Sequence, residues 1–68
     1  MQATMANTAY TSASRAEYAK ERALVVAKSE WTLVHSVTYV GNSINSERRY
    51  RVNDIDGQFL GYVQVAIV

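Results

Sequence analysis

Three arginines in one short segment are the side chains of this chain best suited to chemistry. The segment Glu47-Arg48-Arg49-Tyr50-Arg51 holds three of the seven Lys and Arg residues. An Arg side chain presents planar, bidentate donors that match a carboxylate, a phosphate or the edge of guanine. If the segment is a strand, Arg49 and Arg51 share one of its faces. The sequence therefore indicates a binding surface centred on these arginines.

Two further residues are predicted to lie beside this pair, on the following strand. The predicted partner-binding residues are Arg48, Arg49, Arg51, Tyr62 and Gln64. Three interpretations stay open: a solvated face, a protein partner, since Arg and Tyr are enriched at interface hot spots, or a nucleic acid read by a sheet. The neighbouring acidic residues, Glu47 and Asp54 among them, dilute the positive charge of the patch.

The other candidates for chemistry favour structural roles. His35 is the only histidine, and no nucleophile or carboxylate is placed beside it by the pattern, so we predict a structural or interface role and no catalytic residue. The segment 54–57 (Asp-Ile-Asp-Gly) is similar to the start of a calcium loop, but the chain offers Val65 or Ala66 where that loop needs its bidentate Glu. Without cysteine there is neither a disulfide nor a Cys/His cluster. The sequence predicts a non-enzymatic protein with no metal and no cofactor.

The distribution of charge indicates the elements that position these residues. All charged side chains fall in residues 15–30 and 47–56, and the segments 31–46 and 57–68 carry none. Ser14-Arg15-Ala16-Glu17 fits a capping box, and good helix formers follow to about Ser29. A stripe of small residues at helical spacing is predicted to face a sheet, namely Ala16, Ala19, Ala23, Val26 and Ala27.

Three strands are predicted after the helix. Residues 31–40 alternate, residues 41–46 are rich in turn formers, and a second strand covers 47–53. Asp56-Gly57 predicts a type I′ hairpin turn, with the third strand from Gln58. The expected fold is α+β: a two-layer αβββ unit with one N-terminal helix packed on a three-stranded antiparallel meander.

The predicted turn fixes a register between the second and third strands. It pairs Ile55 with Gln58, Asp54 with Phe59, Val52 with Gly61, Arg51 with Tyr62, Tyr50 with Val63, and Arg49 with Gln64. One face then collects the apolar side chains and packs against the helix. These are Trp31, Leu33, Val37, Tyr39, Tyr50, Val52, Phe59, Val63, Val65 and Ile67.

The uncharged C-terminal strand predicts association. Sixty-eight residues are near the lower limit for an independent fold, and an apolar edge strand without Lys or Pro pairs with other chains. In a meander the third strand is an edge, so we expect a homodimer. Its dimer edge is predicted at Val63, Val65, Ile67 and Val68.

The remaining expectations concern domain organisation and setting. Residues 1–11 are expected to be a flexible lead-in and 12–68 a single domain. Lack of cysteine and of a long apolar run favours a cytoplasmic protein without membrane contact. In size, αβ make-up and lack of catalytic motifs, the chain resembles small phage proteins that bind and block host enzymes or defence complexes. The resemblance covers no motif. It implies a protein-binding module that occludes or modulates a larger protein or protein–nucleic acid complex.

Overall fold

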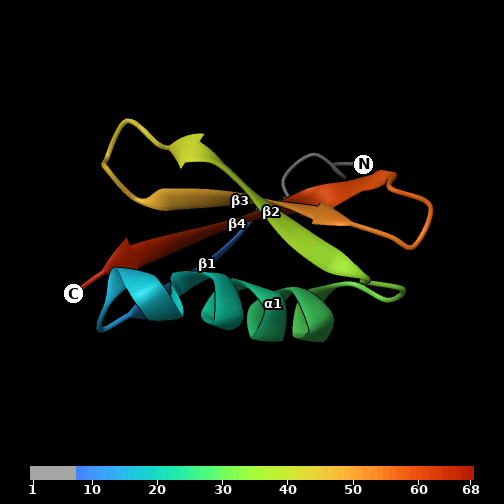
Figure 1. Ribbon diagram of the computed structural model, residues 1–68, viewed down its shortest axis with the longest axis horizontal. Coiled ribbons are helices and arrows are strands. Elements are labelled where there is room, and N and C mark those ends of the chain that lie inside the picture. The colour runs from blue at the N-terminus through green and yellow to red at the C-terminus, as the bar shows by residue number, and fades with distance from the viewer. Residues whose placement is uncertain (1–7) are drawn as a thin grey trace.

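The protein is an α+β domain in which one helical segment packs on one face of a four-stranded sheet (Figure 1). The computed structural model describes residues 8–68. In chain order the elements are β1 (Thr8–Ala13), the short 3₁₀ helix η2 (Ala16–Tyr18), α1 (Ala19–Glu30), β2 (Ser36–Asn42), β3 (Arg48–Asn53) and β4 (Phe59–Ile67). No helix among these residues is long and apolar enough to cross a membrane.

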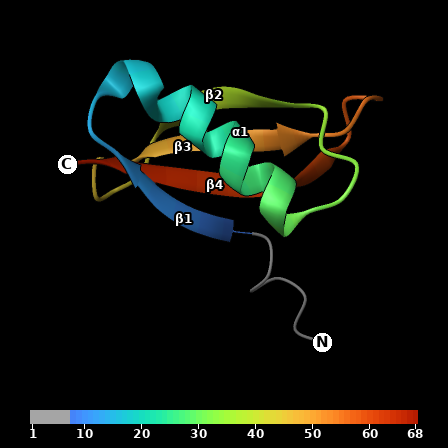
Figure 2. The ribbon, with the colours of Figure 1, turned by 90° about the horizontal axis from the view of Figure 1, so that it is seen from below.

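The sheet has the order β1-β4-β3-β2, with α1 lying diagonally across it (Figure 2). The antiparallel β2-β3-β4 meander expected from sequence is present, but a fourth strand extends it. This strand, β1, runs parallel to β4, so the sheet is mixed. The expected three-stranded, purely antiparallel sheet is therefore corrected to a four-stranded mixed one.

The C-terminal strand lies inside the sheet. β4 pairs with β3 on one side and with β1 on the other, from Thr8↔Tyr62 to Ala13↔Ile67. The prediction of a dimer edge at Val63, Val65, Ile67 and Val68 is therefore wrong, because the backbone of this strand is paired within the chain. Even Val68 donates its backbone N–H to the Ala13 carbonyl, at 2.9 Å. The expected lead-in over residues 1–11 is corrected in the same way: residues 8–11 belong to β1, and 1–7 lie outside the described residues.

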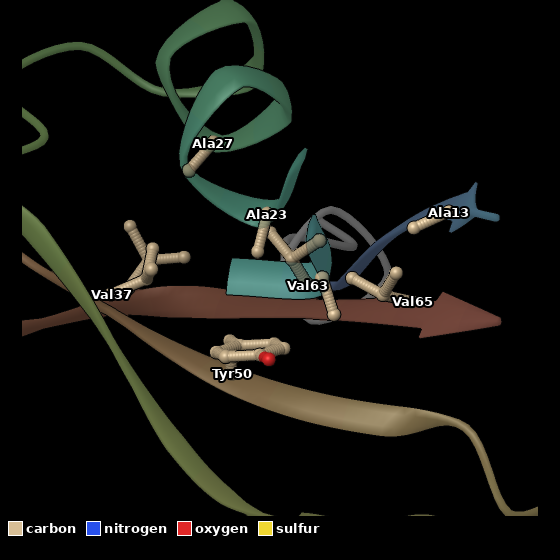
Figure 3. Close-up of a cluster of buried hydrophobic side chains, with 9 residues drawn as sticks. Ala13, Ala23, Ala27, Val37, Tyr50, Val63 and Val65 are labelled. Atoms are coloured by element: carbon tan, nitrogen blue, oxygen red, sulfur yellow. The ribbon is translucent and has the colours of Figure 1, made fainter. Parts of the chain in front are cut away.

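The helix approaches the sheet through small side chains, as predicted. Ala19, Ala23 and Ala27 are fully buried against the valines of the sheet, whereas Ala16 is exposed. The buried side chains of both layers point toward one another in Figure 3. The predicted capping box does not form, because the first turn is the 3₁₀ helix η2, and Arg15 at its N-cap makes no side-chain hydrogen bond.

The strand β2 begins later than its alternating sequence predicts. Residues 31–35 connect the helix layer to the sheet layer, and β2 starts at Ser36. Trp31 still packs against the core, but Leu33 has φ 63° and is 83% exposed. The reason is geometric: α1 continues to Glu30, and the chain must cross between the two layers before it can pair with β3.

The register between β3 and β4 is confirmed in its middle and wrong near the turn. The predicted pairs from Arg49↔Gln64 to Val52↔Gly61 are present. A bulge then shifts the register, so Asn53 pairs with Phe59, and the predicted pairs of Asp54 and Ile55 do not form. Since a shift of one residue reverses the faces, Phe59 moves from the helix side to the opposite side of the sheet.

This bulge follows from the type of turn. The Gly57 N–H donates to the Asp54 carbonyl at 3.0 Å, so residues 54–57 form the turn, and φ is positive at Gly57 (81°) but not at Ile55 or Asp56. A type I′ turn needs positive φ at both central residues. The turn is instead a three-residue loop with a left-handed residue at its end, which adds a bulge to the hairpin.

The β2–β3 hairpin has the same turn, displaced by eleven residues. Ser46 N–H donates to the Ser43 carbonyl at 2.9 Å, and Ser46 has φ 66°. In both turns the first side chain accepts two backbone N–H groups. Asp54 Oδ1 accepts from Asp56 and Gln58, and Ser43 Oγ from Asn45 and Glu47. The two turns therefore differ chiefly in having Ser in one left-handed position and Gly in the other.

Candidate binding surface

No helix among residues 8–68 covers the face of the sheet opposite α1, called here the outer face, which carries most of the predicted partner-binding residues. Alternation places Arg49, Arg51 and Asn53 of β3 on this face, because Tyr50 and Val52 are buried under the helix. Pairing with β3 adds Tyr62 and Gln64 of β4, and pairing with β4 adds Thr8 and Tyr10 of β1. From β2, Thr38 joins through its pairing with Arg51.

Two arginines stack on two aromatic rings at the centre of this face. The Arg49 guanidinium carbon lies 3.8 Å from the centroid of the Tyr62 ring, and that of Arg51 lies 5.3 Å from the centroid of Phe59. The two rings contact each other, with centroids 5.0 Å apart. Arg49, Arg51, Phe59 and Tyr62 are called the Arg–aromatic cluster below. Cation–π attraction of this kind favours a guanidinium placed over the face of a ring.

A polar network beneath the cluster holds Arg51. Asn53 is 92% buried, since its relative exposure is 8%. Its Nδ2 donates to Thr38 Oγ1 at 3.0 Å and to Ser36 Oγ at 3.3 Å, and its Oδ1 accepts from Arg51. Arg51 also donates to the Gly57 carbonyl at 3.3 Å. The side chain amide is thus satisfied by three side chains, and Arg51 is held in place without an acidic partner.

The arginines of β3 keep their positive charge uncompensated. Within residues 8–68 the ion pair formed is Arg15–Glu17, at 3.9 Å, so no carboxylate pairs with Arg48, Arg49 or Arg51. The Arg49 Nε atom is buried and has no hydrogen-bond partner among the described residues. An uncompensated cationic group on an open face attracts carboxylate or phosphate groups.

The structure separates one predicted binding residue from the others. Arg48 pairs with the buried Val65, so it lies on the helix side, where its guanidinium carbon is 5.1 Å from the Tyr39 ring centroid. Arg49, Arg51, Tyr62 and Gln64 share the outer face as predicted. The position of Arg48 on the helix side follows from simple alternation, because adjacent residues of a strand face opposite sides of the sheet.

Two aromatic residues of the surface were not predicted from the sequence. Phe59 reaches the outer face through the bulge, and Tyr10, which is 67% exposed, arrives with β1. The position of Phe59 could have been predicted from the turn sequence 54–57, because this sequence also suits a three-residue loop that ends in Gly. The signal for Tyr10 was the Thr- and Tyr-containing segment 8–13 together with an apolar β4 that needed a neighbour.

The other sequence candidates lie away from the outer face. His35 is exposed before β2, and its backbone N–H donates to the Asn53 carbonyl at 2.8 Å. The 54–57 segment forms a hairpin turn, as predicted, and Asp54 Oδ1 accepts backbone N–H groups there. Residues 8–68 contain no group of three His, Cys, Asp or Glu side chains arranged to hold a metal ion.

Comparisons with known proteins yield no relative. No protein-family model, no curated protein and no solved structure matches this chain. The function must therefore be inferred from the surface itself.

Proposed function

We propose that this protein is a small non-enzymatic binding module that engages a larger macromolecular partner through its outer face. The observation that carries the proposal is the Arg–aromatic cluster: two arginines are fixed on two aromatic rings, on an open face, without a carboxylate partner among residues 8–68. Binding by such a surface would occlude the partner or modulate it. This is how small phage inhibitors of host enzymes or defence complexes, which the chain resembles in size, act on their targets.

The first candidate partner is a protein with carboxylates on its surface, alone or within a protein–nucleic acid complex. Arg and Tyr anchors that are ordered before binding lose little conformational entropy, and such residues dominate the energy of protein interfaces. The formal net charge of +1 supports this candidate, because a protein partner needs local rather than overall complementarity.

A second candidate is single-stranded nucleic acid, which the three rings on this face favour. Tyr10, Phe59 and Tyr62 lie on the same side of the sheet as Arg49 and Arg51. Single-stranded binders combine aromatic or guanidinium planes for base stacking with cationic groups for the backbone. The same residues would carry either function, so the experiment has to separate the two partners.

The test compares two double variants, each of which loses two positive charges at different positions. Arg49→Ala/Arg51→Ala removes the cationic part of the cluster, whereas Arg15→Ala/Lys28→Ala removes two exposed charges elsewhere. Anisotropy titrations at low salt with labelled single-stranded DNA and RNA test the second candidate. Affinity capture from the source cells, followed by reconstitution with the purified captured protein, tests the first.

We expect a stoichiometric complex that the first double variant abolishes and the control retains. A complex with a purified protein supports the first candidate, and salt-sensitive binding to an oligonucleotide supports the second. If both double variants behave like the wild type in both assays, the outer face is not the recognition surface and the proposal fails.

A further inference from the structure

The strand β2 leaves one edge of the sheet open. Within residues 8–68 it pairs with β3 alone, so no described strand pairs with the backbone groups on its other side. Residues 36–42 (Ser-Val-Thr-Tyr-Val-Gly-Asn) carry no charge, and Tyr39 and Val40 are each nearly half exposed. Uncharged edges without Lys or Pro are sites of strand addition.

The opposite edge of the sheet is protected by a charged side chain. Arg22 of α1 reaches across to β1, where its Nε donates to Thr11 Oγ1 at 3.1 Å. A charged group leaning over an edge strand discourages pairing with another chain. No ion pair or side-chain hydrogen bond from α1 to β2 covers the second edge within the described residues. Of the two edges, β2 is therefore the one suited to pairing.

A groove accompanies this edge on the helix side of the sheet. It has a volume of about 610 Å³, and its lining includes Glu17, Lys20, Glu21, Leu24 and Val37. Its floor is apolar, since Leu24 and Val37 belong to the core or pack on it. Its rim on α1 carries both signs of charge. A strand added to β2 would lie directly beside this groove, and side chains on the helix side of that strand would fill the groove.

We propose that a second copy of this chain occupies the β2 edge, in antiparallel pairing across a two-fold axis. A two-fold axis perpendicular to the joined sheet keeps both helices on the same side of it. Residues that pair across the axis must then face the same side in each copy, so the axis passes between one residue and the same residue of the second copy. Thr38 is the centre of residues 36–40, the part of β2 that ends at the bulge between Tyr39 and Gly41. Thr38 then stands opposite Thr38 of the second copy.

This register makes the two surfaces complementary. It places Val37, which lines the groove, opposite Tyr39 of the second copy, and Tyr39 faces the helix side because it pairs with the buried Tyr50. The half-exposed Tyr39 ring thereby covers the groove of the other subunit. The rim of each groove carries Lys20 together with Glu17 and Glu21, so we expect charges of opposite sign to face each other between the two rims.

The first test places like charges on the proposed axis. Wild-type protein is expected to sediment as a dimer of the 7.6 kDa chain. Thr38→Lys sets two ammonium groups directly opposite each other, which we expect to raise the dissociation constant at least about tenfold. Thr38→Val is the matched control, because it also loses the hydrogen bond to Asn53 but adds no charge. Ser12→Lys introduces the same charge into β1 and is expected to leave the dimer intact.

The second test leaves β2 unchanged and acts on the groove rim. Lys20→Glu makes the rim uniformly acidic and is expected to dissociate the dimer, whereas Lys28→Glu, an equal change at an exposed position outside the groove, is not. Circular dichroism of each variant confirms that it is folded. A wild-type monomer up to millimolar concentration overturns the proposal. So does dissociation by Ser12→Lys in place of Thr38→Lys, which would move the interface to β1.

Discussion

Exchanging the left-handed residues of the two hairpin turns tests the backbone geometry of this fold. Ser46 has φ 66° and Gly57 has φ 81°, and both end turns with the same hydrogen bonds. A left-handed conformation costs a residue with a Cβ about 1–2 kcal/mol. Glycine avoids this cost but loses about 0.5–1 kcal/mol more conformational entropy on folding. The net effect predicted for Ser46→Gly is a stabilisation of about 0.5–1 kcal/mol.

The reverse exchange is expected to have the opposite effect. An added Cβ at Gly57 meets no atom within 4 Å, so Gly57→Ser introduces no clash, and its cost is that of the backbone alone. We expect a loss of about 0.5–1 kcal/mol. Because the two turns lie at opposite ends of β3, the effects should add, and the double variant should have nearly wild-type stability.

Urea unfolding followed by far-ultraviolet circular dichroism and by Trp31 fluorescence measures these changes. With an m-value of about 1 kcal/mol/M, each substitution shifts the midpoint by about 0.5–1 M, in opposite directions and with an unchanged slope. Thermal unfolding should show a shift of about 2–8 °C. If Ser46→Gly lowers the free energy of unfolding or leaves it unchanged, the left-handed geometry of that turn does not carry the strain assigned to it.

Two further substitutions probe the core and the outer face. Ala23→Leu inserts a large side chain where the fully buried Ala23 of α1 contacts the sheet, and should lower the free energy of unfolding by about 1–3 kcal/mol. The control, Lys28→Leu on the exposed side of the helix, should change the free energy of unfolding little. Equal effects of the two variants in urea titrations would contradict the close approach of helix and sheet. Asn53→Ala leaves Arg51 without its side-chain acceptor and should lower the free energy of unfolding by about 1–3 kcal/mol. The Arg51 side chain should also become more mobile, which NMR of its guanidinium resonances measures. An unchanged Arg51 would show that the contact with Phe59 and the hydrogen bond to the Gly57 carbonyl are enough to hold it.

Local sequence signals predicted several features within single elements correctly. The alanine stripe of the helix, the pairing of Tyr50 with Val63, and the common face of Arg49 and Arg51 all follow from periodicity within one segment or one hairpin. The capping box was predicted wrongly, so local signals did not predict every feature within a single element. The first turn, residues 16–18, winds as a 3₁₀ helix as the chain turns from β1 toward the sheet surface, and the cap geometry is lost.

Other errors in the predicted fold arose where the outcome depended on a one-residue shift in strand register or on pairing between distant segments. The three-residue loop at 55–57 and the predicted type I′ turn both use Gly57, but they differ by one residue in the pairing of the two strands. That single residue decides whether Phe59 packs under the helix or joins Arg51 on the outer face. Asp and Gly suit both types of turn, so composition alone does not choose between them.

The sequence by itself determined an apolar, uncharged C-terminal strand that needs a partner on both sides. Only the tertiary structure decided that one partner is β1, from the opposite end of the chain. Parallel pairing between segments about fifty residues apart leaves no periodic signal, because it depends on the path of the intervening helix and hairpins. Pairing with β1 covers the edge of β4, leaves β1 and β2 as the edges of the described sheet, and brings Tyr10 beside Gln64 on the outer face. That one long-range pairing removes β4 as an edge open to association and adds the exposed ring of Tyr10 to the outer face.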